Sequence, residues 1–451
     1  MKVFIGPVDF GLWKDIANKL EKRGHEVIYL GACSHPGYAY RYQAVSGSAT
    51  VKCIEYLYSL RNRTGRVSVV NSPLKAAVIT LTHVLSAVLF IELLARGVDH
   101  FIYVAGRSLL PGQFDLLILK ALDKRVIAYL SHGGDSRPPY LDGRIVPVSH
   151  PSDDDLSRVY RLSKRQSKCV GRATRWASIA VVNRFHAQFS MRPFVEFFSL
   201  LKWGNTDISG ELDKLSIECP AKLPNVNSRP VKIMHVPSFP AGKGSDEIQR
   251  AIDLLKSDGF KIDYEVVTGV SHREVIRRLA SVDLVIDQLY SDVPLASLAS
   301  EATVLEVPVV VAGYELSYWV NQLDSNIYPN VICHPDDLYR TLNRMISEPE
   351  CLPDLREKIK YFLDAYGFDW TVNQIEKLLD GSGEFDLIDP KELNYFMGMG
   401  LSESRLGQFL VAYYDRYGVE GFFVNEKQKF LDAILGFVNI VRSSQSSKTI
   451  C

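Results

Sequence analysis

The chain has 451 residues, enough for two or three domains with cores of their own. Its hydrophobic (47%) and charged (23%) fractions are ordinary for a globular protein, and 52 Lys and Arg balance 52 Asp and Glu, so the net charge gives no reason to expect a nucleic-acid partner. The seven cysteines are odd in number, scattered and without CxxC spacing, which indicates a reduced cytosolic chain without a metal site.

Residues 1–200 predict one α/β unit, in which short β-branched runs alternate with segments of helical length. The predicted strands are 3–5, 27–30, 101–104, 126–130 and 178–182, with a first helix at 12–23. Gly6 follows the first strand in the loop GPVDFG, where a backbone without side chains lets a ligand approach closely. The loop has no GxGxxG fingerprint, so it does not predict a dinucleotide site.

The segment 76–91, AAVITLTHVLSAVLFI, has no charged residue when His83 is neutral. It is shorter than the roughly 20 residues that a spanning helix needs, and it contains hydroxyl groups such as those of Thr82 and Ser86. We therefore expect a helix of the N-terminal domain that is buried or faces a membrane. A full span and a shallow interfacial helix are the alternatives.

Polar side chains follow the predicted strand 126–130 in the turn LSHGGDSR. Its two glycines allow a tight turn that presents His132 and Asp135 beyond the carboxyl end of the strand, where ligands of parallel sheets bind. A histidine satisfied within the loop is the alternative. Arg137 either pairs with Asp135 or lines an acceptor pocket.

A basic helix is predicted from Ser152 to Arg175, and Ser152 and Asp155 have the spacing of a capping box. The cations that follow, with no acid among them, are Arg158, Arg161, Lys164, Arg165, Lys168, Arg172 and Arg175. A solvated basic helix is the default interpretation, and a surface for an anionic membrane or a lipid-diphosphate acceptor is the alternative. Nucleic acid is not indicated, because no aromatic residues interleave the cations.

Residues 201–230 are rich in glycine and proline and predict a linker, and 231–352 predict a second α/β unit. Its strands are expected at 231–236, 264–268, 284–287 and 307–311. Four polar residues fall at or near the carboxyl ends of these strands, where ligands bind in such sheets. They are Lys243, His272, Asp287 and Glu301.

Lys243 lies in AGKGSDE, beside Gly244 at the start of a helix. A helix N-terminus offers free N–H groups and partial positive charge, and the lysine adds a full charge for a diphosphate. A solvated loop lysine is the alternative. For His272, helix capping by the preceding Ser271 explains the segment as well as a ligand contact does. Asp287 either faces the ligand-binding edge of the sheet or caps the following turn.

The rest of the chain predicts helices. Residues 355–379 form a long helical pattern within the segment 353–380, and a glycine break follows at 381–383. Residues 381–451 are helical by pattern and rich in Tyr and Phe, which predicts an appended module for packing or for a partner.

Three phrases of the second unit are HVPSFPAGKGSDEIQRAI, VTGVSHREVIRRLASVDLVIDQL and ASEATVLEVPVVVAG. Their order and spacing, with the strand–helix–strand–HGGD segment upstream, resemble the GT-B-fold retaining glycosyltransferases of family 4 over roughly residues 1–378. The resemblance implies an α/β fold with two Rossmann-like domains facing a cleft. The first would be the acceptor side and the second the nucleotide-sugar side, with helix 353–380 crossing back onto the first domain.

The resemblance also implies roles for single residues. His132 would lie near the reacting sugar and Asp135 would shape the site, while Lys243 would contact the donor pyrophosphate. Glu301 would bind the ribose, because a carboxylate accepts two hydrogen bonds from a vicinal diol; a helix N-terminal residue without a ligand is the alternative. The expected donor-binding residues are Gly6, Lys243, Gly244, His272, Asp287 and Glu301. No cofactor or metal is expected, because the acidic run Asp153–Asp155 belongs to a helix cap and no other DxD context suggests a metal. The resemblance implies a pyrophosphate held by Lys, Arg and helix dipoles, and a leaving diphosphate that takes the acceptor's proton, so that little is needed from a protein base.

The chain departs from the family pattern at three places. The arginine that the family has a few residues before Lys243 is missing, since Ser238, Phe239 and Pro240 stand there. Either another cation, such as Arg273 or Arg250, substitutes for it or donor binding is weakened. Val293 stands in place of the first glutamate, beside Asp292, and Glu306 replaces a customary glycine. These departures keep a second hypothesis open, a catalytically degenerate partner with the same fold. A nucleotide-sugar epimerase is a third, although no cluster of cleft carboxylates is evident.

The leading expectation is a retaining hexosyltransferase that moves a sugar from a nucleotide-sugar donor to a glycan, lipid-linked or protein acceptor. The hydrophobic and basic elements of the first domain favour the cytoplasmic side of the cell membrane and synthesis of envelope polysaccharide or glycoconjugates, with peripheral contact to anionic lipid.

Overall fold

The computed structural model describes residues 1–8, 12–31, 48–63, 73–131, 133–196, 229–322, 328–348, 351–424 and 426–448. The chain forms two compact units. Unit 1 comprises Met1–Pro138, Lys164–Phe198 and Thr371–Leu393, and unit 2 comprises Pro139–Ser163, Ser199–Trp370 and Asn394–Cys451. Each unit thus consists of three separate segments, so the chain passes between the units more often than the predicted boundaries imply.

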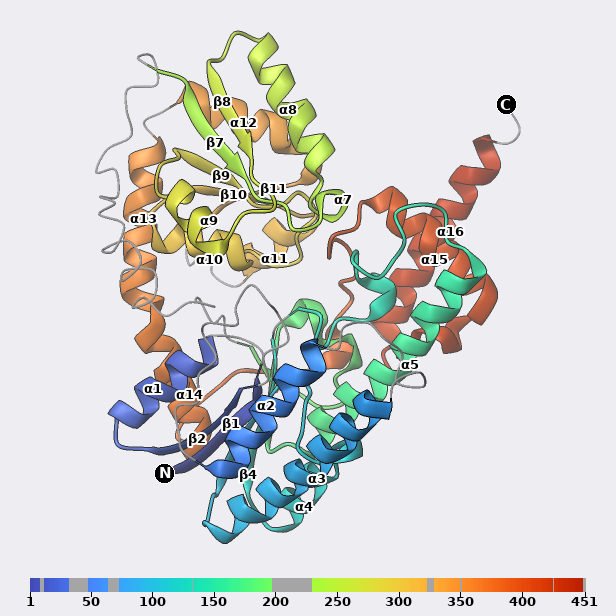
Figure 1. The fold of residues 1–451 in the computed structure, drawn as a ribbon. Helices are drawn as coiled ribbons and strands as arrows, with labels where there is room; N and C mark the ends of the chain where they lie inside the picture. Colours follow the sequence, from blue (N-terminus) through green and yellow to red (C-terminus); the bar gives the residue numbers. More distant parts are fainter. Residues whose placement is uncertain are drawn as a thin grey trace. The chain divides into compact units, whose positions relative to one another are not determined.

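Unit 1 is built on a seven-stranded sheet with the order β12-β6-β5-β4-β3-β1-β2, of which β1, β2 and β4 are labelled in Figure 1. Its strands are β1 (Lys2–Val8), β2 (Glu26–Gly31), β3 (His100–Val104), β4 (Arg125–Leu130), β5 (Ile179–Val182), β6 (Phe194–Val195) and β12 (Leu387–Ile388). All neighbours pair in parallel except β12, which pairs antiparallel with β6. The central strands are buried along nearly their whole length, as expected for a parallel sheet covered on both faces.

Helices connect these parallel strands. The longer helices of unit 1 are α1 (Leu12–Lys22), α2 (Ala49–Arg63), α3 (Pro73–Ala95) and α4 (Phe114–Ala121), with parts of α5 (Asp153–Trp176) and α14 (Phe368–Asp380). The step from β1 to β2 runs in one direction across the sheet, and the steps to β3, β4 and β5 run in the other. Right-handed crossovers therefore place α1 on one face and α2, α3, α4 and α5 on the opposite face.

Unit 2 contains a five-stranded parallel sheet with the order β11-β10-β9-β7-β8. The strands are β7 (Val231–His235), β8 (Ile262–Val266), β9 (Leu284–Ile286), β10 (Val309–Ala312) and β11 (Val331–Cys333). The helices around it are α7 (Pro240–Lys243), α8 (Ser245–Ser257), α9 (His272–Leu279), α10 (Ser297–Val304), α11 (Leu316–Gln322), α12 (Leu338–Ser347) and α13 (Cys351–Tyr366). The strand order reverses between β7 and β9, the position at which open α/β sheets bind ligands.

The predicted helix 355–379 is divided into α13 and α14 around Gly367. From Thr371 onward α14 belongs to unit 1. There Glu376 pairs with Arg23 and, at 2.9 Å, with His25. These contacts tie α14 to the turn between α1 and β2, within unit 1.

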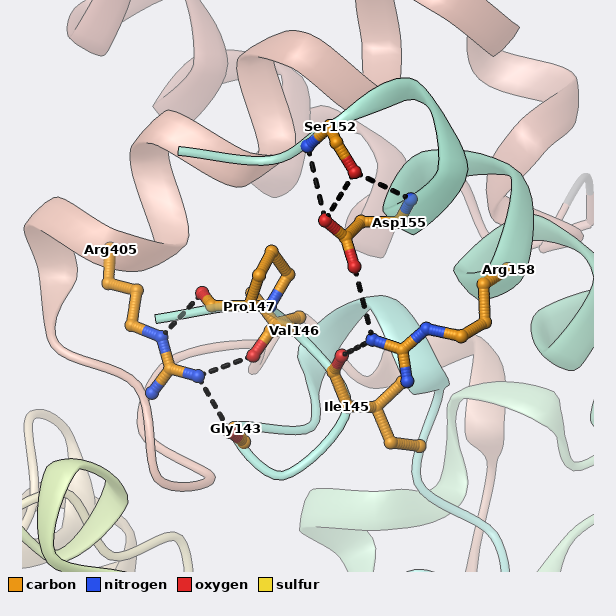
Figure 2. Close-up of polar contacts among 8 residues, drawn as sticks. All are labelled: Gly143, Ile145, Val146, Pro147, Ser152, Asp155, Arg158 and Arg405. Carbon is orange, nitrogen blue, oxygen red and sulfur yellow. Dashed lines mark hydrogen bonds and ion pairs between the residues drawn. The ribbon is translucent and has the colours of Figure 1, made fainter. Parts of the chain in front are cut away.

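The C-terminal helices α15 (Glu403–Tyr417) and α16 (Gln428–Lys448) belong to unit 2. Arg405 of α15 donates to the carbonyl oxygens of Gly143 (2.7 Å), Val146 and Pro147 (3.0 Å), as Figure 2 shows. Burial lowers the pKa of this guanidinium from its usual value. Its partners are neutral carbonyls, so Arg405 fixes loop and helix by hydrogen bonding rather than by an ion pair.

Figure 2 also shows the start of α5. The Ser152 hydroxyl donates to Asp155 Oδ2 (2.6 Å) and accepts from the Asp155 N–H (3.2 Å), and the Ser152 N–H donates to Asp155 Oδ2 (3.2 Å). The capping box predicted from the spacing of these two residues is thus confirmed.

Candidate functional site

The loop after β7 and the loop after β9 meet at the switch point of the second sheet. The single turn of α7 ends at Gly244, which has a left-handed φ of +71°. A Cβ at this position would lie 2.6 Å from the Cβ of Leu289, so only glycine fits. The Leu289 N–H donates to the Lys243 carbonyl (3.0 Å), which holds the two loops together.

Lys243 and Asp287 form an ion pair across these loops. Lys243 Nζ lies 2.6 Å from Asp287 Oδ1, and the side chains are 15% and 0% exposed. Asp287 Oδ2 is buried and has no hydrogen-bond partner among the described residues. An ammonium has three donors, so Asp287 aims the amine and leaves donor capacity for an anionic ligand.

His235, the last residue of β7, lies beside this pair and is fully buried. Its Nδ1 is 2.8 Å from the Ile286 carbonyl oxygen, which can only accept, so Nδ1 carries a proton. Burial lowers the pKa of His235 to about 4, with a contribution from the charge of Lys243. The ring is therefore neutral at pH 7, and its Nε2 accepts from the Ser245 hydroxyl at 2.9 Å. Sequence reasoning gave His235 no role, although its place at a strand end was a usable signal.

His272 and Glu301 form the second pair. His272 Nε2 lies 2.9 Å from Glu301 Oε1, and their side chains are 13% and 6% exposed. His272 begins α9, where the Ser271 hydroxyl accepts from the Glu274 N–H (3.3 Å), so the predicted cap is present together with the contact to Glu301. Glu301 lies in the second turn of α10, which begins at Ser297; the alternative of a helix N-terminal residue was wrong.

These two pairs lie after β7, β8 and β9, which are neighbours in the sheet. Each pair combines a buried carboxylate with a nitrogen base, an arrangement suited to binding anions and hydroxyl groups. Arg250, one of the cations considered as a replacement for the missing arginine, is an exposed residue of α8 that pairs with Glu247 at 2.9 Å. No group of three potential metal ligands occurs among the residues that the structure describes.

A C-terminal segment lies at the same edge of the sheet. The Gly400 N–H donates to the carbonyl of Tyr290, which follows β9, at 2.9 Å. The Glu403 N–H donates to the hydroxyl of Tyr314, which follows β10, at 2.7 Å. The start of the helical module therefore forms part of the loop cluster around the switch point, which its sequence did not indicate.

Glu306 occupies a left-handed conformation with φ +55°. This is the position at which the family resembled by the sequence has a glycine, and glycine adopts such a φ without steric cost. Glu306 therefore holds a conformation that costs a residue with a Cβ more than it costs glycine.

In unit 1, Asp135 lies in the turn after β4, whereas His132 is outside the described residues. Gly133 has φ +68°, and Gln166 donates to the carbonyls of Gly134 and Arg137, both at 2.9 Å. These contacts hold the turn in its tight form.

The guanidinium of Arg137 donates to His186 Nε2 at 2.9 Å. Since arginine cannot accept, His186 is the acceptor. His186 is buried in the 3₁₀ helix Arg184–Phe189, which follows the carboxyl end of β5. Sequence reasoning did not single it out.

Gly6 lies within β1 and has φ +145°. A Cβ there would lie 2.7 Å from the Leu30 carbonyl oxygen of β2. Packing against the neighbouring strand therefore accounts for this glycine, and its role toward a ligand stays a prediction.

No family model and no curated protein matches the chain. Similar solved structures include the glycosyltransferase SnogD from Streptomyces nogalater, at 14% identity over 84% of this chain and 99% of that one, with a TM-score of 0.35. Anabaena HepE in complex with UDP has 14% identity, the same coverages and a TM-score of 0.40. UDP-GlcNAc 2-epimerase from Neisseria meningitidis bound to UDP-GlcNAc has 11% identity, again 84% and 99%, and a TM-score of 0.41.

Glycosyltransferases are thus among the structures to which the chain is similar, as the sequence resemblance predicts. The fold class rests on the chain itself, which has two Rossmann-like units, each with a parallel sheet and connecting helices, and a C-terminal helical extension.

Proposed function

We propose that this protein is a retaining glycosyltransferase that binds a nucleotide-sugar donor on unit 2. The observation that supports it best is the placement of Lys243 with Asp287, and of His272 with Glu301, after three adjacent strands at the switch point. Lys243 would bind the diphosphate, and Glu301 the ribose hydroxyls. Both are chemistries that a directed ammonium and a buried carboxylate can provide.

The transfer itself would need positioning and stabilisation of phosphate charge more than a protein base. His132 and Asp135 of unit 1 would contact the sugar and the acceptor. The acceptor would be a glycan, a lipid-linked glycan or a protein, and the reaction would serve envelope polysaccharide or glycoconjugate synthesis in the cytoplasm. The proposal requires no metal or cofactor.

Thermal shift with UDP, GDP and ADP, each compared with its nucleoside, tests the donor site. A ligand that binds the native state raises its stability. Replacing Lys243 alone would leave Asp287 buried and unpaired, so the informative variant is Lys243→Met combined with Asp287→Asn. We expect this variant to lose the stabilisation by the diphosphate and to retain any stabilisation by the nucleoside. Lys256→Met on the surface of α8 is the control.

Equal loss for nucleoside and diphosphate would contradict the phosphate role of Lys243. Stabilisation by none of the nucleotides, in the wild type, would contradict the donor site as a whole.

A degenerate partner protein is the second candidate, and one specific observation favours it. The charge of Lys243 is already balanced by a fully buried carboxylate, and no arginine stands a few residues before it. Slow hydrolysis of a nucleotide sugar without acceptor separates the two. A transferase would release free nucleotide and lose that activity in Lys243→Met/Asp287→Asn, whereas a degenerate partner would bind without release.

A further inference from the structure

Helix α3 has an unusual distribution of side chains. The face packed on unit 1 includes two hydroxyl residues, Thr82 (5% exposed) and Ser86 (3%). The outer face carries large aliphatic residues at helical spacing, namely Leu74, Leu81, Val84, Val88 and Ile91. The remaining buried residues of α3 are apolar, but a surface helix in water normally carries polar residues on its outer face. The outer face of α3 is therefore suited to a non-aqueous environment.

Helix α4 repeats this pattern. It buries Asp115 completely, and the carboxylate accepts from the Leu109 N–H at 2.7 Å. The exposed apolar side chains of α4 and of its C-cap residue are Phe114, Leu117, Ile118 and Leu122. Together α3 and α4 provide nine of the 20 large hydrophobic side chains that are exposed among the described residues. Such concentration marks an interaction surface rather than scattered exposure.

The two helices lie on the same face of the first sheet, because α3 leads into β3 and α4 leads from β3 to β4 by crossovers of the same direction. Figure 1 shows them together at the lower end of the view. Their outer sides form what we call the α3–α4 face, defined by the nine residues above.

A row of cations borders the α3–α4 face. The exposed basic residues of α5 within unit 1 are Lys164, Arg165, Lys168, Arg172 and Arg175. Their spacing places them along one side of the helix. Arg172 donates to the carbonyl of Gly112 (3.3 Å), two residues before the exposed Phe114, so this row adjoins α4. Within the described parts of the chain, none of these cations has a carboxylate partner.

We propose that the α3–α4 face is a membrane-docking surface that binds the interface of a bilayer containing anionic lipids. The apolar residues would enter the boundary between headgroups and acyl chains, and the cations of α5 would bind the anionic headgroups. This charge complementarity favours a lipid surface over a second copy of the chain, which would oppose one basic row to another.

α3 docks on the membrane and does not cross it. It is the one helix in the described parts of the chain that is long and apolar enough to span, but a third of its most apolar stretch is buried inside the protein. The buried residues Thr82, Ser86 and Leu89 pack one side of α3 against the rest of unit 1. A helix packed in this way can present only its outer face to lipid.

Flotation of the full-length protein with vesicles tests the proposal without any donor or acceptor. We expect binding to vesicles of phosphatidylcholine with phosphatidylglycerol, weaker binding to phosphatidylcholine alone, and loss of binding at high salt. Each basic residue near an anionic surface changes the affinity by about fivefold. Lys164→Glu with Lys168→Glu should therefore lower it at least about tenfold, while Lys256→Glu with Lys261→Glu in unit 2, which changes the net charge equally, should not.

The apolar contribution is tested by Val84→Gln, Val88→Gln, Leu117→Gln and Ile118→Gln together. This variant should remain in the fraction that does not float with the vesicles, and it should keep the circular dichroism spectrum and melting temperature of the wild type. Leu254→Gln with Val266→Gln, at exposed positions of unit 2, is the matched control and should float as the wild type does.

Four outcomes would overturn the proposal. The wild type fails to float with anionic vesicles, or it floats equally well with neutral ones. The wild type is a dimer in solution that the four-fold glutamine variant dissociates, which assigns the face to a second copy. The vesicle-bound protein resists extraction by alkaline carbonate, which assigns α3 to a span.

Discussion

At the scale of single residues, His235 makes stability depend on pH. Its folded-state pKa is about 4, well below the ordinary value of 6.5, chiefly because it is buried. Between these two values the unfolded chain binds a proton that the folded chain does not, so stability is complete above pH 6.5 and is lost as the pH falls toward 4. The difference corresponds to about 3 kcal/mol.

His235→Asn removes the titrating ring and can keep the donation to the Ile286 carbonyl. Urea unfolding of both proteins across pH 4 to 6.5 measures the effect. The wild type should lose more stability than the variant over this range. Parallel curves would mean that the ring takes up its proton in the folded state.

Glu306 offers a second test at this scale, because its φ of +55° is unfavourable for any residue with a Cβ. Glu306→Gly removes this cost, whereas Glu306→Ala retains it. We expect the glycine variant to be more stable than the alanine variant by about 1 kcal/mol, part of the gain being offset by the greater freedom of glycine in the unfolded chain. Equal unfolding midpoints for the two would show that the backbone relaxes at this turn.

Sequence position was enough to select Lys243, Asp287, His272 and Glu301 as candidates, because the carboxyl ends of parallel strands share one edge. It was not enough to predict which of them pair. The bond between His272 and Glu301 depends on how α9 and α10 are placed, and no local pattern specifies that. His186 was missed for the same reason, since its partner Arg137 lies 49 residues away.

At the scale of elements, the glycines at 143 and 400 allow two backbones of unit 2 to approach each other. A Cβ on Gly143 would lie 2.1 Å from the Gly400 carbonyl oxygen, and the Gly143 N–H donates to the Met399 carbonyl at 2.9 Å. The chain cannot shift at this point without breaking that bond. Gly143→Ala should therefore destabilise the protein by about 2 kcal/mol.

Gly436→Ala is the matched control, because Gly436 lies in α16 with open space around the position of a Cβ. Alanine is the better helix former, so this variant should be neutral or slightly more stable. Denaturation in urea compares the two. A Gly143→Ala variant as stable as the control would show that the 143 and 400 loops are not in fixed contact.

Strands and helices followed closely from the sequence, since their periodicity and β-branched runs are local properties. Each predicted strand, such as 231–236 for β7 and 284–287 for β9, occurs within about three residues of its expected bounds. The break between α13 and α14 was not predicted, because Gly367 is tolerated within a helical pattern and its effect depends on the packing of α14 in unit 1.

At the scale of the whole molecule, the assignment of segments to the two units was harder to predict than the helices and strands themselves. The segment 371–393 belongs to the first unit through contacts such as that of Arg125 with the Leu378 carbonyl (2.6 Å), which joins residues 253 positions apart. Likewise, the C-terminal segment contains the helices α15 and α16 that its pattern indicates, but its attachment to the second sheet depends on the backbone bond between Gly400 and Tyr290. Contacts of this range leave no periodic signal.

The division into units also predicts where a nucleotide should act. Lys243, His272, Asp287 and Glu301 all belong to unit 2. A nucleoside diphosphate bound there should slow hydrogen exchange in the loops after β7, β8 and β9, because bound ligand lowers the population of locally opened states. Peptides of β1, β3 and β4 in unit 1 should exchange as before, and α16 provides an internal control within unit 2. Protection that appears in the unit 1 peptides instead would place the nucleotide on the first sheet. The ion pair of Lys243 with Asp287 and the contact of His272 with Glu301 would then be structural contacts of unit 2.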